Sequence, residues 1–538
     1  SIAGRDIFQG RYQAGIDNIL LAYDLSQETE DVSGLSGYFE LEFLEILRML
    51  QKKEGLENTE VKLGYDFIKY SSRNQYRTLL NLVEEYAEDH PGSIFAKRLL
   101  LFANYFYYIG KKDKIVLENA EELFQTDSSL INARILAAYI YFKSADYMRA
   151  RQEFTEILKI KPDYAYAHFY LARIAEEWKE TLTAIDYLNK AIELAPAYRE
   201  AYSRRAYLYK SIYREHDAIR DYKKSLALDP GLVWVINNIG NCYKDMGKYD
   251  SALYYYSLSL QMDTTSSTVY NNRGTLYHTL GDTLQAIEDF KKSIEIYDRF
   301  PYAYNNLGDI YFDSFRLDSA LKYYNKALEI RPNFRDFLID RGDLYYSMEK
   351  YDEARLDFEA AHEIDKSYAY VLKRLGDCNR IQHDFRKALI HYKMALNKNR
   401  FYKYTPYCMG LCYENLQKYD SAMLFLKIAV MIDSSYSSSY ERIGWLYYLM
   451  GDYENSIQYS EKAIALDDKL SDALFNIPLA MLRKGDISGA RKKYAKAVDY
   501  CHKRNMEIPE NAILNLESLI EEQVYPAEAG QVLADYFK

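Results

Sequence analysis

Asparagine side chains recur at matching positions in three consecutive stretches of the chain. The motif Asn-Asn-x-Gly begins at residues 237, 271 and 305, which lie 34 residues apart. A primary amide offers both a hydrogen-bond donor and an acceptor, so a row of amides can pair with the backbone of an extended peptide whatever its sequence. We therefore predict a peptide-binding surface that includes Asn237, Asn238, Asn241, Asn271, Asn272, Asn305 and Asn306.

Charged and aromatic residues lie on both sides of this row. An aromatic and basic group precedes it, with Phe169, Arg173, Arg204 and Tyr207 among its members. After it, residues 335–368 carry ten acidic and five basic side chains, and residues 369–402 carry two acidic and eight basic ones. These two segments could grip a charged ligand or pair with each other across neighbouring helices, which contributes little free energy when the charges are exposed. The predicted binding residues here are Asp340, Lys373, Arg374 and Arg380.

A second aromatic group, near the end of the chain, is predicted to line the same surface. It consists of Tyr404, Tyr407, Trp445 and Tyr448. The segment 505–538 carries apolar residues at helical spacing and is predicted to fold as capping helices over the end of the chain. If that segment left the aromatic group uncovered, the group would form a second docking site.

Residue patterns for metal binding or catalysis are weak. Cys408 and Cys412 have a spacing that two metal ligands on one helix can have. However, Cys412 recurs at the same position as Cys242 and Cys378, where a small packing residue is expected. No HExxH or CxxC arrangement, glycine-rich phosphate loop or nucleophile motif is present in the sequence. We therefore expect no metal, no cofactor and no enzyme activity.

A repeat of 34 residues positions all these side chains. Steps of 34 from Ala138 land on alanine or glycine nine times and then on Pro478, and another column of small residues lies twelve positions later. Glycine inside a helix costs about 0.5–1 kcal/mol relative to alanine, so seven glycines in one column indicate close approach of two antiparallel helices. Eleven copies fill residues 131–504. Because such short units cannot bury a core alone, they must stack into a solenoid.

Residues 1–130 are predicted to form degenerate helical repeats and an N-terminal cap. Gly, Ser, Asn and Pro residues separate the predicted helices. These helices span Asp6–Tyr23, Tyr38–Lys53, Glu60–Ser71, Tyr76–Asp89, Ser93–Ile109 and Lys114–Thr126.

The columns of small and aromatic residues at period 34 resemble the tetratricopeptide repeat. Pro162, Pro196, Pro230 and Pro332 stand where second helices of that repeat end, and the resemblance is strong over 131–504 and weak over 60–130. It implies an all-α, right-handed superhelical solenoid of antiparallel helix pairs. It also implies that the first helices line a concave groove that binds proteins or peptides without catalysis. The family's carboxylate clamp needs Lys and then Asn four residues later, but Lys373 is followed by Asp377.

The composition of the chain limits the class of partner and the cellular location that we expect. A net charge of -10 and a pI near 5.5 argue against nucleic-acid binding, which depends on many cations. The longest apolar run, Leu99–Ile109, is about half of a bilayer span, so no direct membrane insertion is expected. Because the chain begins with Ser1, removal of an N-terminal signal stays open. We expect a soluble protein of either the cytoplasm or the periplasm.

These features predict a non-catalytic protein–protein interaction scaffold that binds an extended protein or peptide segment in its concave groove. Such a scaffold could belong to a multiprotein complex. Two alternatives stay open, namely the substrate-recognition arm of a larger enzyme such as a glycosyltransferase and a structural subunit of an envelope or secretion assembly. The 34 residues after the last repeat are too few for a catalytic domain, so such an enzyme would need a domain outside this sequence.

Overall fold

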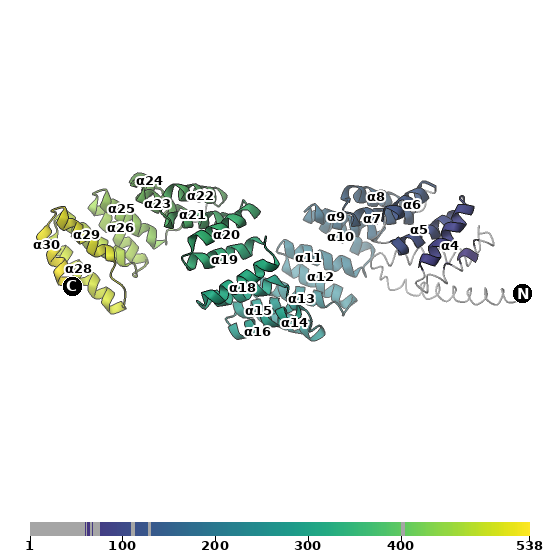
Figure 1. Cartoon of the computed structure of the whole chain (residues 1–538), viewed down its shortest axis with the longest axis horizontal. Helices are drawn as coiled ribbons and strands as arrows, with labels where there is room; N and C mark the ends of the chain where they lie inside the picture. The colour runs from purple at the N-terminus through teal and green to yellow at the C-terminus, as the bar shows by residue number, and fades with distance from the viewer. Residues whose placement is uncertain are drawn as a thin grey trace, which may run out of the picture. The chain divides into compact units, whose positions relative to one another are not determined.

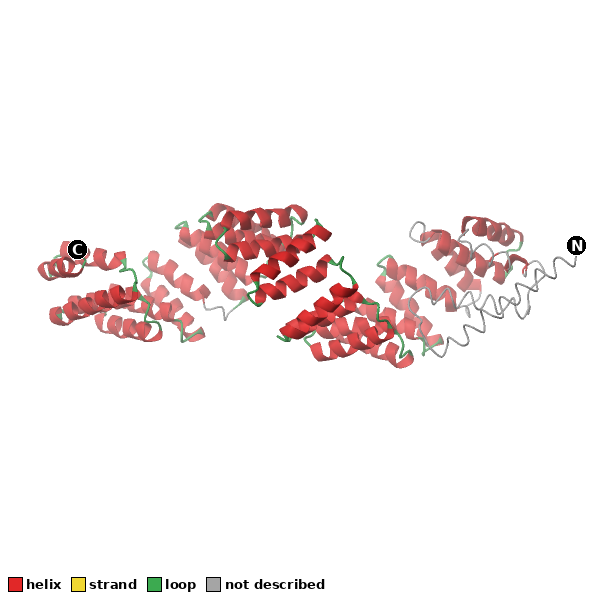
Figure 2. Cartoon of the chain, turned by 90° about the horizontal axis from the view of Figure 1, so that it is seen from below, coloured by secondary structure: helices red, strands yellow, loops and turns green. Residues whose placement is uncertain are grey.

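A computed structural model describes residues 60, 62–64, 67, 76–108, 113–126, 131–399 and 404–537. The regular elements in these ranges are all α-helices, joined by short loops (Figure 2). The helices predicted over Asp6–Tyr23 and Tyr38–Lys53, and most of Glu60–Ser71, lie outside the described residues. The next three predicted helices correspond to α4 (Tyr76–Asp89), α5 (Ile94–Tyr108) and α6 (Asp113–Thr126).

The chain divides into two compact units, Ser1–Leu276 and Tyr277–Lys538, called unit 1 and unit 2 below. Consecutive helices pack side by side in pairs within each unit (Figure 1). Beyond α6, unit 1 contains α7 (Ile131–Lys143), α8 (Tyr147–Ile160), α9 (Ala165–Glu177), α10 (Thr181–Leu194), α11 (Arg199–Ser211), α12 (Glu215–Leu228), α13 (Val233–Asp245), α14 (Tyr249–Met262) and most of α15 (Ser267–Thr279).

Unit 2 continues the same alternation of a first and a second helix. Its helices are α16 (Thr283–Ile296), α17 (Pro301–Asp313), α18 (Leu317–Ile330), α19 (Arg335–Ser347), α20 (Tyr351–Ile364), α21 (Ala369–Ile381), α22 (Phe385–Lys398), α23 (Tyr404–Asn415), α24 (Tyr419–Ile432), α25 (Ser437–Leu449), α26 (Tyr453–Leu466), α27 (Ser471–Lys484), α28 (Ile487–Arg504), α29 (Glu510–Glu521) and α30 (Pro526–Tyr536).

The turns inside the helix pairs from α7–α8 to α27–α28 share one recurring backbone feature. A residue with positive φ ends the first helix, and it is glycine in four pairs, such as Gly247 with φ 70°. Elsewhere a larger residue adopts this conformation, such as Phe315 with φ 55°. In several repeats the next residue is an aspartate that caps the second helix, as Asp146 does by accepting a bond from the Arg149 amide at 3.2 Å.

The glycine column makes room for aromatic rings. A Cβ atom on Gly308 would lie 2.5 Å from ring atoms of Tyr324, and one on Gly240 would lie 2.7 Å from the ring of Tyr256. These rings come from the second helix of the same pair and are fully buried. The neighbouring Tyr311 stacks on Tyr323 with ring centroids 5.2 Å apart. In these pairs close helix approach, as predicted from the sequence, depends on a glycine facing a ring, whereas Gly410 faces Leu426 and Gly444 faces Ser460.

The last helices share one core with the end of the repeat array. Leu516 and Leu519 of α29 and Val532 of α30 are buried against residues of α27 and α28. Ion pairs join the same elements, from Arg483 to Glu522 and from Arg491 to Asp535, each at 2.6 Å. Helix α27 runs through Pro478 without ending there.

Candidate functional site

A cavity of about 310 Å³ opens on the first helices of three consecutive repeats in unit 1. Two large aromatic side chains at this cavity are solvent-exposed, Tyr207 by 55% and Trp234 by 50%. Exposed rings beside a cavity can pack on an incoming side chain. The cavity is lined by Phe169 and Arg173 of α9, by Glu200, Ser203, Arg204 and Tyr207 of α11, and by Trp234 of α13.

Two arginines of this cavity share one carboxylate. Arg173 and Arg204 each lie 3.6 Å from Oε2 of Glu176 on α9. Burial raises the pKa of Glu176 to about 7, although both arginines oppose that shift. Burial and the nearby Arg204 lower the pKa of Arg173. The three side chains thus form a compact, partly desolvated charge cluster at the cavity.

Several buried polar atoms beside the cavity lack a hydrogen-bond partner. They are the hydroxyl of Tyr198, Oε1 of Glu176 and Oε2 of Glu200, whereas Nε of Arg173 makes no hydrogen bond but lies 3.6 Å from Oε2 of Glu176. A buried polar group without a partner costs about 1–3 kcal/mol, so such groups rarely cluster without reason. The set contains both donors and acceptors, as does a peptide backbone.

The predicted asparagine row in unit 1 is bonded largely within itself. Nδ2 of Asn272 donates to Oδ1 of Asn237 at 3.0 Å, and the Tyr256 hydroxyl donates to Oδ1 of Asn241 at 2.7 Å. Nδ2 of Asn241 lies 3.4 Å from Oδ1 of Asn238. Asn237 and Asn271 are buried, whereas Asn238 and Asn272 are half-buried. The second asparagine of each motif is therefore the one that remains accessible.

In unit 2 the predicted residues form a bonded network. Asn305 is buried and donates to Oδ2 of Asp340 at 2.7 Å, while Asn306 is half-buried. Burial and the nearby Asp309 raise the pKa of Asp340 to about 7. Burial also raises the pKa of Asp309 to about 6, although Asp309 accepts a bond from the Tyr324 hydroxyl at 2.7 Å.

The predicted cations of unit 2 have carboxylate partners nearby. Arg374 donates to Asp343 at 2.6 Å, and its guanidinium lies 3.9 Å from the ring centroid of Tyr346. Lys373 lies 2.5 Å from Asp377 on the same helix. Arg380 interacts electrostatically with Asp377. Acidic and basic side chains of the two segments therefore contact each other across α19 and α21.

The second aromatic group is partly covered. Tyr404 and Tyr407 both contact Tyr436, with ring centroids 5.5 Å and 5.2 Å apart. Trp445 and Tyr448 stack at 5.1 Å and pack against the core shared by α27–α30. The capping helices thus approach this end of the aromatic surface.

All five cysteines are buried, including Cys408 and Cys412. Within the ranges that the structure describes, no group of three or more His, Cys, Asp or Glu residues is arranged to hold a metal ion. The same ranges contain no helix long and apolar enough to cross a membrane.

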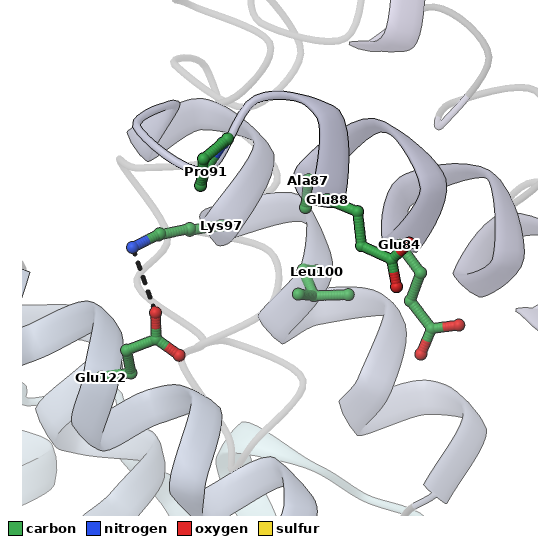
Figure 3. Close-up of a pocket in the computed structure, with 7 residues that line it drawn as sticks. All are labelled: Glu84, Ala87, Glu88, Pro91, Lys97, Leu100 and Glu122. Carbon is green, nitrogen blue, oxygen red and sulfur yellow. Dashed lines mark hydrogen bonds and ion pairs between the residues drawn. The ribbon is translucent and has the colours of Figure 1, made fainter.

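Two further cavities lie away from this region. One of about 310 Å³ lies among α4, α5 and α6, where Lys97 pairs with Glu122 at 3.1 Å (Figure 3). Glu84 and Glu88 lie on its other side, and burial together with Glu88 raises the pKa of Glu84. The other, of about 550 Å³, lies among α16, α17 and α18 of unit 2. The α9–α13 cavity differs from both because it combines exposed rings with unpaired buried polar atoms.

Sequence reasoning identified Phe169, Arg173, Arg204 and Tyr207 of the α9–α13 cavity but missed its acidic members. Glu176 and Glu200 were not among the predicted residues, although Glu176 lies three positions after Arg173 and so shares its helix face. That spacing was the available signal. The burial of Glu176 depends on how α9 and α11 pack, which no single helix reveals.

Models of the tetratricopeptide repeat match residues 135–199, 231–299, 265–333, 336–368 and 437–470. The chain is also similar to the APC/C hetero-tetramer Cut9-Hcn1, at 14% identity over 81% of this chain and 99% of that chain, with a TM-score of 0.42. A tetratricopeptide repeat protein from Parabacteroides merdae ATCC 43184 matches at 18% identity over 46% and 98% of the two chains, with a TM-score of 0.38. YrrB, described as a TPR protein with an unusual peptide-binding site, matches at 23% identity over 35% and 97%, with a TM-score of 0.31. On its repeat matches and its all-helical paired architecture, the chain belongs to the tetratricopeptide repeat proteins.

Proposed function

We propose that this protein-interaction scaffold holds an extended segment of a partner protein along the first helices of unit 1. The segment contacts α9, α11 and α13 at the cavity and continues along the accessible asparagines of α13 and α15. One partner side chain packs between Tyr207 and Trp234, and its backbone bonds to the polar groups around them. The scaffold is not catalytic in this proposal.

The unpaired polar atoms beside the cavity carry the proposal. The Tyr198 hydroxyl can donate, and Oε1 of Glu176 and Oε2 of Glu200 can accept. A peptide backbone presents the complementary acceptors and donors in alternation. These atoms have almost no accessible surface, so a bound backbone would reach them only after side chains at the cavity shift; it would then supply partners to groups that are already desolvated.

Asn238, Asn241 and Asn272 extend this surface toward α15. Asn238 and Asn272 are half-buried, so each retains contact with solvent and can bond to a peptide group. Asn237 and Asn271 are buried and would position their neighbours instead of touching the partner. Replacement of Asn272 is a poor test, because it would leave the buried Oδ1 of Asn237 without its donor.

In unit 2 we propose a structural role for the network that includes Asn305, Asp340, Lys373 and Arg374. Each of these side chains already bonds to another residue of the network. A ligand would have to break those bonds before making its own. This cost favours the α9–α13 cavity of unit 1, where buried polar atoms lack hydrogen bonds, as the main binding region.

The proposal is tested with peptides selected from a random library on the full-length chain. Trp234→Ala and Arg204→Ala should each weaken binding of the selected peptides about tenfold or more, as is typical of aromatic and arginine anchors. Tyr254→Ala is the matched control, because Tyr254 is 61% exposed on the second helix α14. Equal binding by all these variants would contradict the proposed site.

A further inference from the structure

Three consecutive second helices of unit 2 expose a large aliphatic side chain at the same repeat position. Leu356 of α20 is 61% exposed, and Ile390 of α22 and Leu424 of α24 are each 57% exposed. Other repeats carry Tyr254, which stands alone, or polar residues in this column, namely Gln152, Asp186, Arg220, Glu288, Lys322, Gln458 and Lys492. When neighbouring repeats expose aliphatic residues at the same repeat position, a contact surface explains them better than chance does.

Opposite charges surround the first two of these residues. The residues four before, three before and three after Leu356 are acidic, whereas the equivalent residues around Ile390 are basic. Positions three and four residues apart share one face of a helix, so each aliphatic side chain is flanked by charge of a single sign. The acidic set is Asp352, Glu353 and Glu359, and the basic set is Arg386, Lys387 and Lys393, all six of them exposed.

These charges do not neutralise each other within the chain. Asp352 and Glu359 both pair with Arg355 of their own helix, at 3.2 Å and 3.3 Å. Lys387 pairs with the capping Asp384 at 3.0 Å. Among the residues that the structure describes, no ion pair joins α20 to α22, and neither Glu353 nor Lys393 forms one.

We infer that this surface binds a second copy of the same chain about a two-fold axis between α20 and α22. Such an axis runs along these two parallel second helices, so it sets Leu356 against the partner subunit's Ile390 and the acidic helix parallel to the basic one. Glu353, three residues before Leu356, then meets the partner subunit's Lys387, three residues before Ile390. Glu359 meets the partner subunit's Lys393 in the same way. A two-fold interface repeats each contact, so one patch satisfies both copies.

The charge pattern favours a second copy over an unrelated protein. A purely acidic partner would complement α22 but would be repelled by α20, and a basic partner would meet the reverse problem. A partner surface fits only if it places basic residues opposite α20 and acidic residues opposite α22. The two-fold operation on this patch produces that arrangement. The interface uses second helices, so it is independent of the proposed peptide site on the first helices.

The full-length chain is tested by sedimentation equilibrium at concentrations up to about 100 µM, a range that covers weak association. The wild type should form a species of twice 63.2 kDa. Ile390→Asp should weaken the dimer at least about tenfold, because it places a charge in the apolar centre of the contact. Leu284→Asp is the matched control, since Leu284 is 80% exposed on α16 of the same unit but outside the patch. Helical circular dichroism shows whether each variant is folded.

Charge reversal separates this interface from a non-specific apolar contact. A basic variant, with Glu353→Lys and Glu359→Lys, and an acidic variant, with Lys387→Glu and Lys393→Glu, should each be monomeric alone. Mixed together, they should form a heterodimer, because every opposed pair again has opposite signs. A monomeric wild type, a dimer insensitive to Ile390→Asp, or a mixture that stays monomeric would each overturn the inference.

Discussion

Gly308→Ala tests why the repeat requires glycine in its first helix. The new Cβ atom would lie 2.5 Å from Cδ1 and Cε1 of Tyr324, whereas carbon atoms pack best about 3.5–4.0 Å apart. Tyr324 is 1% exposed, and its hydroxyl donates to Asp309 at 2.7 Å, so the ring has no free space to enter. The substitution must therefore displace the ring or separate α17 from α18.

The expected magnitude follows from two opposing contributions. Overpacking a buried site costs about 1–3 kcal/mol, and alanine regains about 0.5–1 kcal/mol because it favours the helix. The net change should be a loss of up to about 2.5 kcal/mol in the free energy of unfolding. Local unfolding of α17 and α18 is measured by hydrogen exchange, because repeat arrays do not always unfold as one cooperative unit.

Gly530→Ala provides the matched comparison. Gly530 also lies inside a helix, α30, but its new Cβ atom would meet only Ile520 Cδ1, at an ordinary 3.9 Å. This change should stabilise its helix by about 0.5–1 kcal/mol. If Gly308→Ala were instead as stable as the parent or more so, the argument that the glycine makes room for a ring would be refuted.

Three other substitutions probe the packing and the electrostatics of unit 2. Ala320→Leu should lower the free energy of unfolding by about 1–3 kcal/mol in a denaturant titration, because Ala320 is fully buried in α18. Unchanged unfolding would show that the helix interface around Ala320 has room for a larger side chain. Arg374→Ala should cost about 3–5 kcal/mol by the same measurement, because it removes a cation from beside the carboxylates of Asp343 and Asp377. A loss below about 1 kcal/mol would mean that water replaces the guanidinium. Asp340→Asn should remove part of the pH dependence of stability. Burial and Asp309 raise the pKa of Asp340 from 3.8 to about 7, so between these values the folded chain holds a proton that the unfolded chain has lost. The parent should therefore lose stability as pH rises from 4 to above 7, and Asp340→Asn should flatten this loss; parallel profiles for the two proteins would contradict the assignment.

The sequence was sufficient for the periodic features of the fold. The 34-residue period and the small columns predicted the helix pairs, and punctuation by Gly, Ser and Pro predicted α4 closely. The period did not reveal which asparagine of each motif is buried. Adjacent helix residues differ by about 100° in direction, and the packing of neighbouring repeats decides which of the two faces solvent. Asn237 is buried and Asn238 half-buried for this reason.

The polar surroundings of the cavity were likewise beyond sequence reasoning. Glu176 bridges arginines of two different repeats, and its raised pKa depends on burial that only tertiary packing creates. In unit 2 the complementary charges of Asp343 and Arg374 were visible in the sequence, but their contact required the relative placement of α19 and α21. Residue spacing in the sequence determines which side chains meet within one helix. It does not determine which side chains meet between repeats, because those contacts depend on how the helices pack.

The central claim is that a partner segment lies across the cavity of α9, α11 and α13. Its most direct test is the affinity of one library-selected peptide for the full-length chain and for Trp234→Ala, with Tyr254→Ala as control, measured by fluorescence anisotropy. We predict that Trp234→Ala weakens binding about tenfold or more and that Tyr254→Ala leaves it unchanged. Equal affinity for the wild type and Trp234→Ala would contradict the claim.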